Sequence, residues 1–233
     1  MLSLADGASR EVRTDASSTN YPIQTAFEVG YPIWYLRGFK YAGVASDGTP
    51  QFYNKDGQVV GQGEIGTEDL QYIGQGIPTF TYGLNIDLSW KGFDFAMYGA
   101  GLGGNSIMPV IFRGGDKNTL KYYYDAYKNG SYPHPSTTNG DWYFWSSTAN
   151  LFKGDYFRIK QLQLGYTLPA QLTRKAAISN LRFYVSLDDF FTFTSYPGLD
   201  PETASMNNST GSGLDWGSYP TMQKIILGVN LTF

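Results

Sequence analysis

The chain has 233 residues, charged side chains at 16% of positions and a net charge of −3, so it lacks the basic surface that nucleic-acid binding requires. Cysteine is absent, which excludes disulfide frameworks, thiol catalysis and cysteine-ligated metal sites. Aromatic residues make up 17% of the chain and glycines number 28, a composition that favours an all-β protein with long loops.

The sequence contains no run of 18 apolar residues, so it predicts no transmembrane helix. The first residues, MLSLADGASREV, have neither a basic region nor an apolar core. We therefore expect no signal peptide in this chain.

Six segments alternate apolar and polar residues with the period of a β-strand. The clearest spans 79–90, where even-numbered positions are apolar and odd-numbered positions are small or polar; Lys91-Gly92 then predicts a tight turn. The 156–168 segment changes phase near its middle, which indicates either a bulge or a strand end outside the apolar band. The remaining segments are a weaker one at 33–41, one beginning at Phe93, and those at 181–193 and 224–233.

The connections between these segments differ in length. Those at 42–78, 103–154 and 196–220 are long, whereas 91–92 is very short and 169–180 is moderate. Long loops at one end and short turns at the other are typical of an outer-membrane β-barrel. Ten residue steps from Phe80 to Trp90 give about 33 Å of strand. At a tilt of about 40° this spans about 25 Å, the height of such a barrel's apolar band.

The last residues, KIILGVNLTF, carry a glycine, an apolar residue and a final aromatic at Gly228, Leu231 and Phe233. This spacing resembles the C-terminal signal by which outer-membrane barrels are recognised for assembly. One position departs from that signal: Ile226 stands where a polar residue is usual.

Four internal segments extend the resemblance to one family: GYPIWYLRGFKYAGV, IGQGIPTFTYGL, YFRIKQLQLGYTLP and FTFTSYPGLDPE. In order and spacing the chain resembles the C-terminal part of SusC/RagA-type TonB-dependent outer-membrane transporters. The resemblance implies the C-terminal strands of a large antiparallel transmembrane β-barrel, with long extracellular loops and short periplasmic turns. Because such barrels close about 22 strands around a plug, it also implies that residues 1–233 are a fragment without plug domain or signal peptide.

The function that the resemblance implies is TonB-dependent import of a glycan oligomer or peptide across the outer membrane. The implied partners are a SusD-like surface lipoprotein, outer-membrane lipid and, through the missing N-terminal part, TonB with ExbB and ExbD. We expect no enzymatic activity, no cofactor and no bound nucleic acid.

The aromatic loop sequence DWYFW and the later Asp-Trp pair are the candidates for substrate contact, because flat rings beside polar groups suit sugars or a protein surface. Packing of the loops against one another is the alternative interpretation. The candidate residues are Trp142, Tyr143, Trp145, Asp215 and Trp216.

Other motifs favour structural interpretations. The GxGxxG pattern of 99–104 is not followed by a helical pattern, so we interpret it as a glycine-rich strand end entering a loop. The sequence around Asn54 to Gly57 is similar to a calcium loop but lacks its first ligand. His134 is the only histidine and is expected in a solvated loop, and Asp200 with Glu202 is expected in a turn.

Two alternatives from other classes remain open. A soluble carbohydrate-binding β-sandwich also alternates apolar and polar residues, with the apolar face turned inward. A small complete barrel would need its own signal peptide and a closed set of strands.

Overall fold

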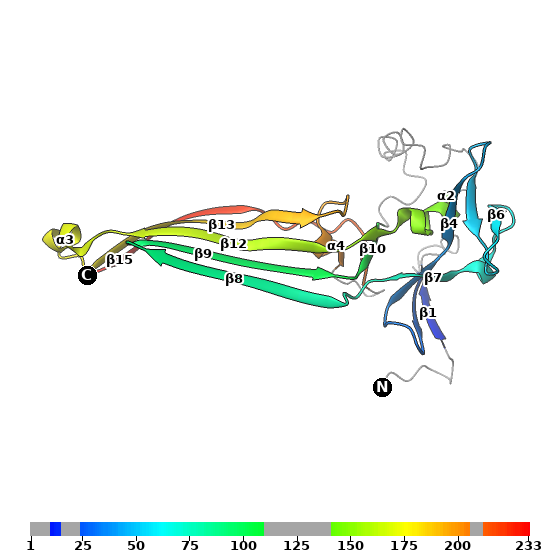
Figure 1. Cartoon of the computed structure of the whole chain (residues 1–233), viewed down its shortest axis with the longest axis horizontal. Coiled ribbons are helices and arrows are strands. Elements are labelled where there is room, and N and C mark those ends of the chain that lie inside the picture. Colours follow the sequence, from blue (N-terminus) through cyan, green and yellow to red (C-terminus); the bar gives the residue numbers. More distant parts are fainter. Residues whose placement is uncertain (1–9, 15–23, 110–140, 206–211) are drawn as a thin grey trace. The chain divides into compact units, whose positions relative to one another are not determined.

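The computed structural model describes residues 10–14, 24–109, 141–205 and 212–233 (Figure 1). They form two compact units. The loop unit is drawn from Met1–Pro78, Gly104–Gly154 and Tyr196–Tyr219, and the strand unit comprises Thr79–Gly103, Asp155–Ser195 and Pro220–Phe233.

The strand unit is a single antiparallel sheet, here called the long sheet, in the order β15-β13-β12-β9-β8. Strands that follow one another within this unit are therefore neighbours, although only the β8–β9 and β12–β13 connections are short. Its strands are β8 (Phe80–Trp90), β9 (Phe93–Gly103), β12 (Tyr156–Thr167), β13 (Asn180–Thr194) and β15 (Lys224–Thr232).

Two turns close the same end of the long sheet. Lys91 and Gly92 link β8 to β9 with φ of 49° and 89°, the left-handed conformation that suits a two-residue hairpin. The link from β12 to β13 holds the short helices α3 (Ala170–Thr173) and η6 (Arg174–Ala176). The Thr167 N–H donates to the Gly92 carbonyl at 2.8 Å, so the two turns lie side by side.

The phase change in β12 is a bulge. Between the rung of Met97 and the rung of Gly99, β9 has one intervening residue, β12 has two and β13 has three. In β13 the extra length includes Asp189 at φ 54°, a conformation that a non-glycine residue seldom adopts. Because one residue is added in β12, Phe157 lies on the same face as the apolar residues after the bulge.

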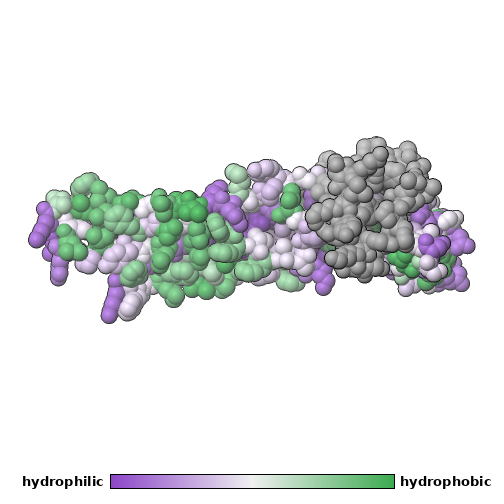
Figure 2. Space-filling model, turned by 90° about the horizontal axis from the view of Figure 1, so that it is seen from above, coloured by the Kyte–Doolittle hydropathy of each residue, from purple (hydrophilic) through white to green (hydrophobic). Residues whose placement is uncertain are grey.

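One face of the long sheet is therefore apolar across all five strands, and its side chains are largely exposed. We call it the apolar face, and Figure 2 shows hydrophobic side chains gathered over this part of the chain. Its exposed members are Phe80, Tyr82, Leu84, Leu88, Trp90, Phe93, Leu164, Phe183, Phe191, Phe193, Ile225, Leu227, Val229 and Leu231.

The described residues of the loop unit form three small sheets, ordered β1-β2-β3-β7, β4-β5-β6 and β11-β10-β14. Their strands are β1 (Arg10–Thr14), β2 (Gln24–Glu28), β3 (Tyr35–Gly38), β4 (Lys40–Val44), β5 (Pro50–Tyr53), β6 (Val59–Gly61), β7 (Gln71–Gln75), β10 (Ser106–Pro109), β11 (Phe152–Lys153) and β14 (Leu214–Asp215). The helices are η2 (Thr67–Asp69), α2 (Asp141–Trp145), η5 (Thr148–Asn150) and α4 (Pro201–Ser205). Among the described residues, none of the helices combines the length and apolar character needed to cross a membrane.

The single strand predicted at 33–41 is wrong. The segment forms β3 and β4 in different sheets, with Phe39 between them. The Phe39 N–H donates to the Ser146 carbonyl at 3.0 Å, and a Cβ on Gly38 would clash with that same carbonyl. The approach of a distant segment therefore ends the strand at a residue without a side chain.

Within the described part of the loop unit, buried hydrophobic side chains form three clusters. The largest joins Phe39 and Phe52 with Ile65 and Leu70. The second centres on Leu36, Met108 and Leu214, and the third on Ile107, Tyr196 and Ala204.

Candidate functional site: the two faces of the long sheet

A trough of glycines crosses the apolar face near the end of β9. Gly99, Gly101 and Gly103 point to this face, and a Cβ on each would come closer than 3.0 Å to an aromatic ring. The rings are those of Phe157, Tyr82 and Phe80 in that order. The GxGxxG pattern is thus the glycine-rich end of β9, where the glycines leave room for aromatic rings, and Gly104 follows the strand with φ 80°. The predicted strand end entering a loop is confirmed.

The rings over this trough form a continuous row across four strands. Phe80 and Tyr82 have centroids 5.9 Å apart, Tyr82 and Phe157 are 5.8 Å apart with planes within 7°, and Phe157 continues to Phe193 at 6.5 Å. The Tyr82 hydroxyl donates to the Tyr156 carbonyl at 3.2 Å. An aromatic band at the edge of an apolar surface is what the interfaces of a membrane barrel require.

The opposite face, here called the polar face, has its own glycine gap. Asp94 on β9 and Arg182 on β13 form an ion pair across β12, with the Arg182 Nε 2.9 Å from Oδ1 of Asp94. Gly165 lies between them, and a Cβ there would be 2.5 Å from both side chains. Both charges are partly shielded, with side chains 18% and 34% exposed.

A second gap on the polar face lies under an aromatic ring. Tyr184 on β13 is directly opposite Gly228 on β15, and its ring occupies the space that a Gly228 side chain would need. The Arg182 guanidinium is 4.9 Å from the centroid of that ring, within cation–π range. Gly228 therefore has a local structural role, which is independent of any recognition of the terminal motif.

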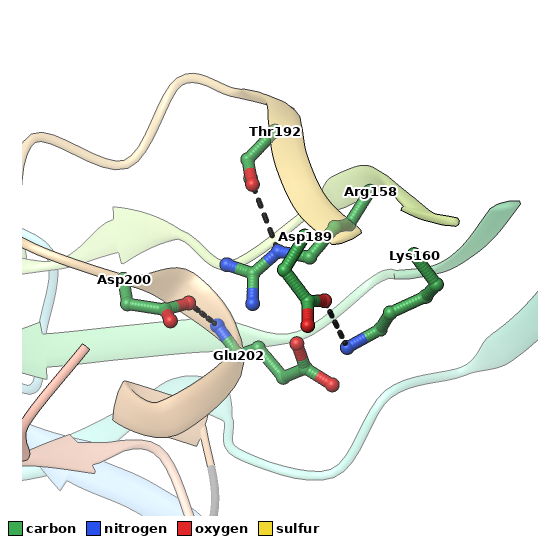
Figure 3. A network of polar contacts seen from close by, with 6 residues as sticks. All are labelled: Arg158, Lys160, Asp189, Thr192, Asp200 and Glu202. Atoms are coloured by element: carbon green, nitrogen blue, oxygen red, sulfur yellow. Dashed lines mark hydrogen bonds and ion pairs between the residues drawn. The ribbon is translucent and has the colours of Figure 1, made fainter. Parts of the chain in front are cut away.

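The bulge carries a further set of charges (Figure 3). Lys160 and Asp189 form an ion pair at 3.3 Å, and the buried Arg158 donates from Nε to the Thr192 hydroxyl at 2.8 Å. The bulge thus brings a lysine and an aspartate together in the middle of a membrane-length strand.

The loop unit holds the predicted substrate-contact residues. Trp145 is completely buried, and Asp215 is 4% exposed. Asp215 accepts a hydrogen bond from the Tyr196 hydroxyl at 2.5 Å and another from the Gly217 N–H at 2.8 Å. The Trp145 ring and the Asp215 carboxylate therefore lie in the interior of the loop unit, and direct ligand contact by the five candidate residues stays a prediction.

The other three candidate residues are not fully buried or are not described. Tyr143 is half-buried, with its ring centroid 5.2 Å from that of Phe39. Trp216 packs against the cluster of Leu36. The side chain of Trp142 lies outside the described part of the chain, as does the whole of His134.

The segment resembling a calcium loop is a hairpin turn. The Asn54 side-chain oxygen accepts the N–H groups of Asp56 at 3.1 Å and Gln58 at 2.8 Å. The buried Asp69 carboxylate accepts the N–H groups of Gly66 and Lys55, each at 2.8 Å. These two bonds lower the pKa of Asp69 below its ordinary value. The side-chain oxygens of Asn54 and Asp69 thus accept hydrogen bonds from backbone N–H groups.

The turn predicted at Asp200 and Glu202 is the start of the short helix α4. The Asp200 carboxylate accepts the Glu202 N–H at 2.9 Å where α4 begins (Figure 3). The residues that sequence reasoning missed are Gly165, Tyr184 and the pair of Asp94 with Arg182. Finding them requires the cross-strand register, which periodicity within one strand does not supply.

Comparison with known proteins identifies relatives of this chain. No protein-family profile matches the chain. TonB-dependent receptor P3 of Formosa agariphila is 34% identical over 185 residues, which cover 74% of this chain and 18% of the receptor. TonB-dependent receptor P26 of the same organism is 25% identical, again over 185 residues, covering 74% of the chain and 19% of the receptor.

Solved structures agree on the fold. The RagAB peptide transporter superposes with a TM-score of 0.75 at 21% identity, covering 99% of this chain and 25% of the matched one. The RagAB peptide importer in its open-open state gives 0.74 at 22% identity, with the same coverage. The chain thus spans about a fifth to a quarter of the proteins it matches. The predicted all-β antiparallel fold is confirmed.

Proposed function

We propose that this chain, which is homologous to TonB-dependent receptors of the SusC/RagA type, forms part of the wall of an outer-membrane β-barrel that imports nutrients. The observation that carries the proposal is the apolar face, which is exposed across five strands. A surface of this size is costly in water, and lipid is the environment that removes the cost.

The dimensions and the edges of the long sheet support the proposal. The 11 residues of β8 match the length of a tilted membrane strand. Among the described residues, β8 and β15 each pair on one side only, so each leaves a row of backbone groups for a further strand. In the proposed barrel these edges pair with strands outside residues 1–233, and the plug domain also lies outside this chain.

The cargo and partners follow from the same proposal. The RagAB structures are of a peptide importer, and we propose a peptide or a glycan oligomer as the imported nutrient. A SusD-like surface lipoprotein would cover the entrance, and TonB with ExbB and ExbD would supply energy. The role is transport, and no bond of the cargo needs to be broken.

The test measures which face of β8 contacts lipid and which contacts water. Residues 1–233 contain no cysteine, so with any cysteine outside them replaced, single cysteines for spin labels can be introduced in the full-length receptor at Leu84 and Leu88, and at Asn85 and Asp87. Labels at the two leucines should respond to lipid-soluble quenchers, and labels at Asn85 and Asp87 to aqueous ones. The reverse pattern would refute the membrane assignment.

The soluble carbohydrate-binding sandwich is the alternative, and the solution behaviour of the chain separates the two. A sheet with two open edges and a bare apolar face should aggregate or need detergent. A sharp monomer peak in detergent-free buffer with a cooperative melt would favour the sandwich. Trp142, Trp145 and Trp216 would then be the sugar-binding residues to replace first.

Assembly of the barrel is the remaining element of the proposal. Gly228, Leu231 and Phe233 would form the signal that directs insertion. Leu231 and Phe233 are exposed on or next to the apolar face, where an assembly factor could contact them. Gly228 would contribute through the ring of Tyr184 that it accommodates.

A further inference from the structure

Three cations gather at the end of the long sheet where the two turns lie. Lys91 is in the β8–β9 turn, and Arg174 and Lys175 are in the β12–β13 turn; all three are exposed. We call them the turn-end cations. The backbone bond between Thr167 and Gly92 joins the bases of the two turns, so the three charges lie at the same end of the long sheet.

Neither turn supplies an acidic side chain to this surface; the negative charge beside it is the α-carboxylate of Phe233, which follows Thr232, whose carbonyl accepts the Ser179 N–H at 2.8 Å. The turns at 91–92 and 168–179 contain neither Asp nor Glu. The nearest carboxylate on β9, Asp94, is paired with Arg182 on the polar face. Hydrophilic residues lie at the corresponding end of the strands in Figure 2, and the turns carry a net positive charge.

An aromatic layer lies immediately inside the turn-end cations. Trp90 and Phe93 are 69% and 47% exposed on the apolar face, and the Phe93 and Tyr166 ring centroids are 4.5 Å apart. The Lys91 Nζ lies 4.8 Å from the Trp90 ring centroid. Leu172, beside Arg174, is 66% exposed. Going outward, the order is apolar band, aromatic rings and positive charge.

That order matches the layers of a phospholipid leaflet, in which hydrocarbon gives way to an interface and then to phosphate. We propose that the turn-end cations bind the phosphates of anionic phospholipids in the leaflet at this end of the barrel. The inference rests on the proposed membrane location. Charge complementarity identifies the occupant: the turns hold three exposed cations and no Asp or Glu, which exceeds the single terminal carboxylate of Phe233 and selects a lipid with net negative charge over a zwitterionic one.

The test uses the full-length receptor reconstituted in mixed vesicles of phosphatidylglycerol and phosphatidylcholine, with bromine on the acyl chains of one lipid at a time. Trp90 is the only tryptophan of the strand unit, and the same measurement on Trp90→Phe corrects for the others. At equal mole fractions, brominated phosphatidylglycerol should quench Trp90 with an apparent affinity on the order of tenfold higher than brominated phosphatidylcholine, since each cation contributes up to about fivefold.

The triple variant Lys91→Gln, Arg174→Gln, Lys175→Gln should bind both lipids equally. A matched control makes the same charge change in the loop unit, at the exposed Lys40, Lys55 and Lys153, and should retain the preference. The charge-preserving variant Lys91→Arg, Arg174→Lys, Lys175→Arg should retain it too, which excludes misfolding as the cause of a loss.

The outcomes separate the two proposals. Equal quenching by both lipids in the wild-type receptor would overturn the phosphate site and leave the membrane location standing. Loss of preference in the Lys40, Lys55, Lys153 control would also overturn it, because the effect would then be one of overall charge. Absence of quenching by either lipid would overturn both proposals.

Discussion

Substitution of Gly228 by alanine should weaken the pairing of β15 with β13, and the cause should be the ring of Tyr184. A Cβ on Gly228 would come closer than 3.0 Å to that ring, so the ring must move. Moving it also separates the ring from the Arg182 guanidinium, now 4.9 Å away. By contrast, a Cβ on Gly83 of β8 would meet its nearest atom at 3.5 Å, an ordinary contact.

Three effects set the expected change in the free energy of unfolding on Gly228→Ala. Overpacking costs about 1–3 kcal/mol, and loss of the cation–π contact costs about 0.5–1 kcal/mol. Replacing a strand glycine by alanine returns about 0.5–1 kcal/mol. Gly228→Ala should therefore lower the free energy of unfolding by about 2 kcal/mol. Gly83→Ala should leave it unchanged or raise it by up to about 1 kcal/mol.

The assay is urea unfolding of the full-length receptor in phospholipid micelles, followed by tryptophan fluorescence, for both variants with and without Tyr184→Ala. In the Tyr184→Ala background the Gly228→Ala substitution should become neutral or stabilising, like Gly83→Ala. The difference between the two backgrounds is the coupling energy, about 2–3 kcal/mol from the three effects above. An equal cost of Gly228→Ala with and without the Tyr184 ring would refute the reasoning.

Three further outcomes are expected. Gly101→Ala should lower the free energy of unfolding by about 1–3 kcal/mol, because its Cβ would meet a tyrosine ring at 2.6 Å and a carbonyl oxygen still closer; the same urea titration measures it, and a neutral effect would contradict the ring row. Asp69→Asn should speed hydrogen exchange at Gly66 and Lys55, the N–H groups that the carboxylate accepts, by an amount equivalent to about 2 kcal/mol. Because those bonds lower the pKa of Asp69, its contribution is complete above the ordinary carboxyl pKa of about 3.9. The contribution is lost as pH falls through the lower folded-state value, so the difference between wild type and variant should narrow below about pH 4, and a constant difference down to pH 2 would contradict the assignment. Phe233→Ala in the full-length receptor should reduce the amount of heat-modifiable, membrane-inserted protein, and unchanged insertion would argue against Phe233 as part of the assembly signal.

Much of the long sheet could be predicted from the sequence, because alternation within a strand depends only on the chain's own geometry. The residues from Phe80 to Trp90 alternate without interruption, and the structure has a strand over those residues. The phase change in β12 indicated a bulge or a strand end, and local pattern could not choose between them. The choice depends on the neighbours, because a bulge exists only relative to the strand beside it.

The candidate substrate-contact residues show more clearly what cannot be predicted from residue type and spacing alone. Trp145 and Asp215 have the residue types of a sugar site, yet both are buried. Their burial depends on segments far apart in sequence: Asp215 is bonded to Tyr196, for example. A motif that describes residue type and spacing does not determine which side of a loop faces the core.

The sequence by itself determined which residues of each long strand share a face, since a period of two is a property of one extended chain. Only the tertiary structure decided what lies across from each residue. The row of rings over Gly99, Gly101 and Gly103, the Asp94–Arg182 pair over Gly165 and the Tyr184 ring over Gly228 each join different strands. The physical reason is that side-chain space is shared between strands, so a glycine acquires its role from the ring or ion pair that the register places above it.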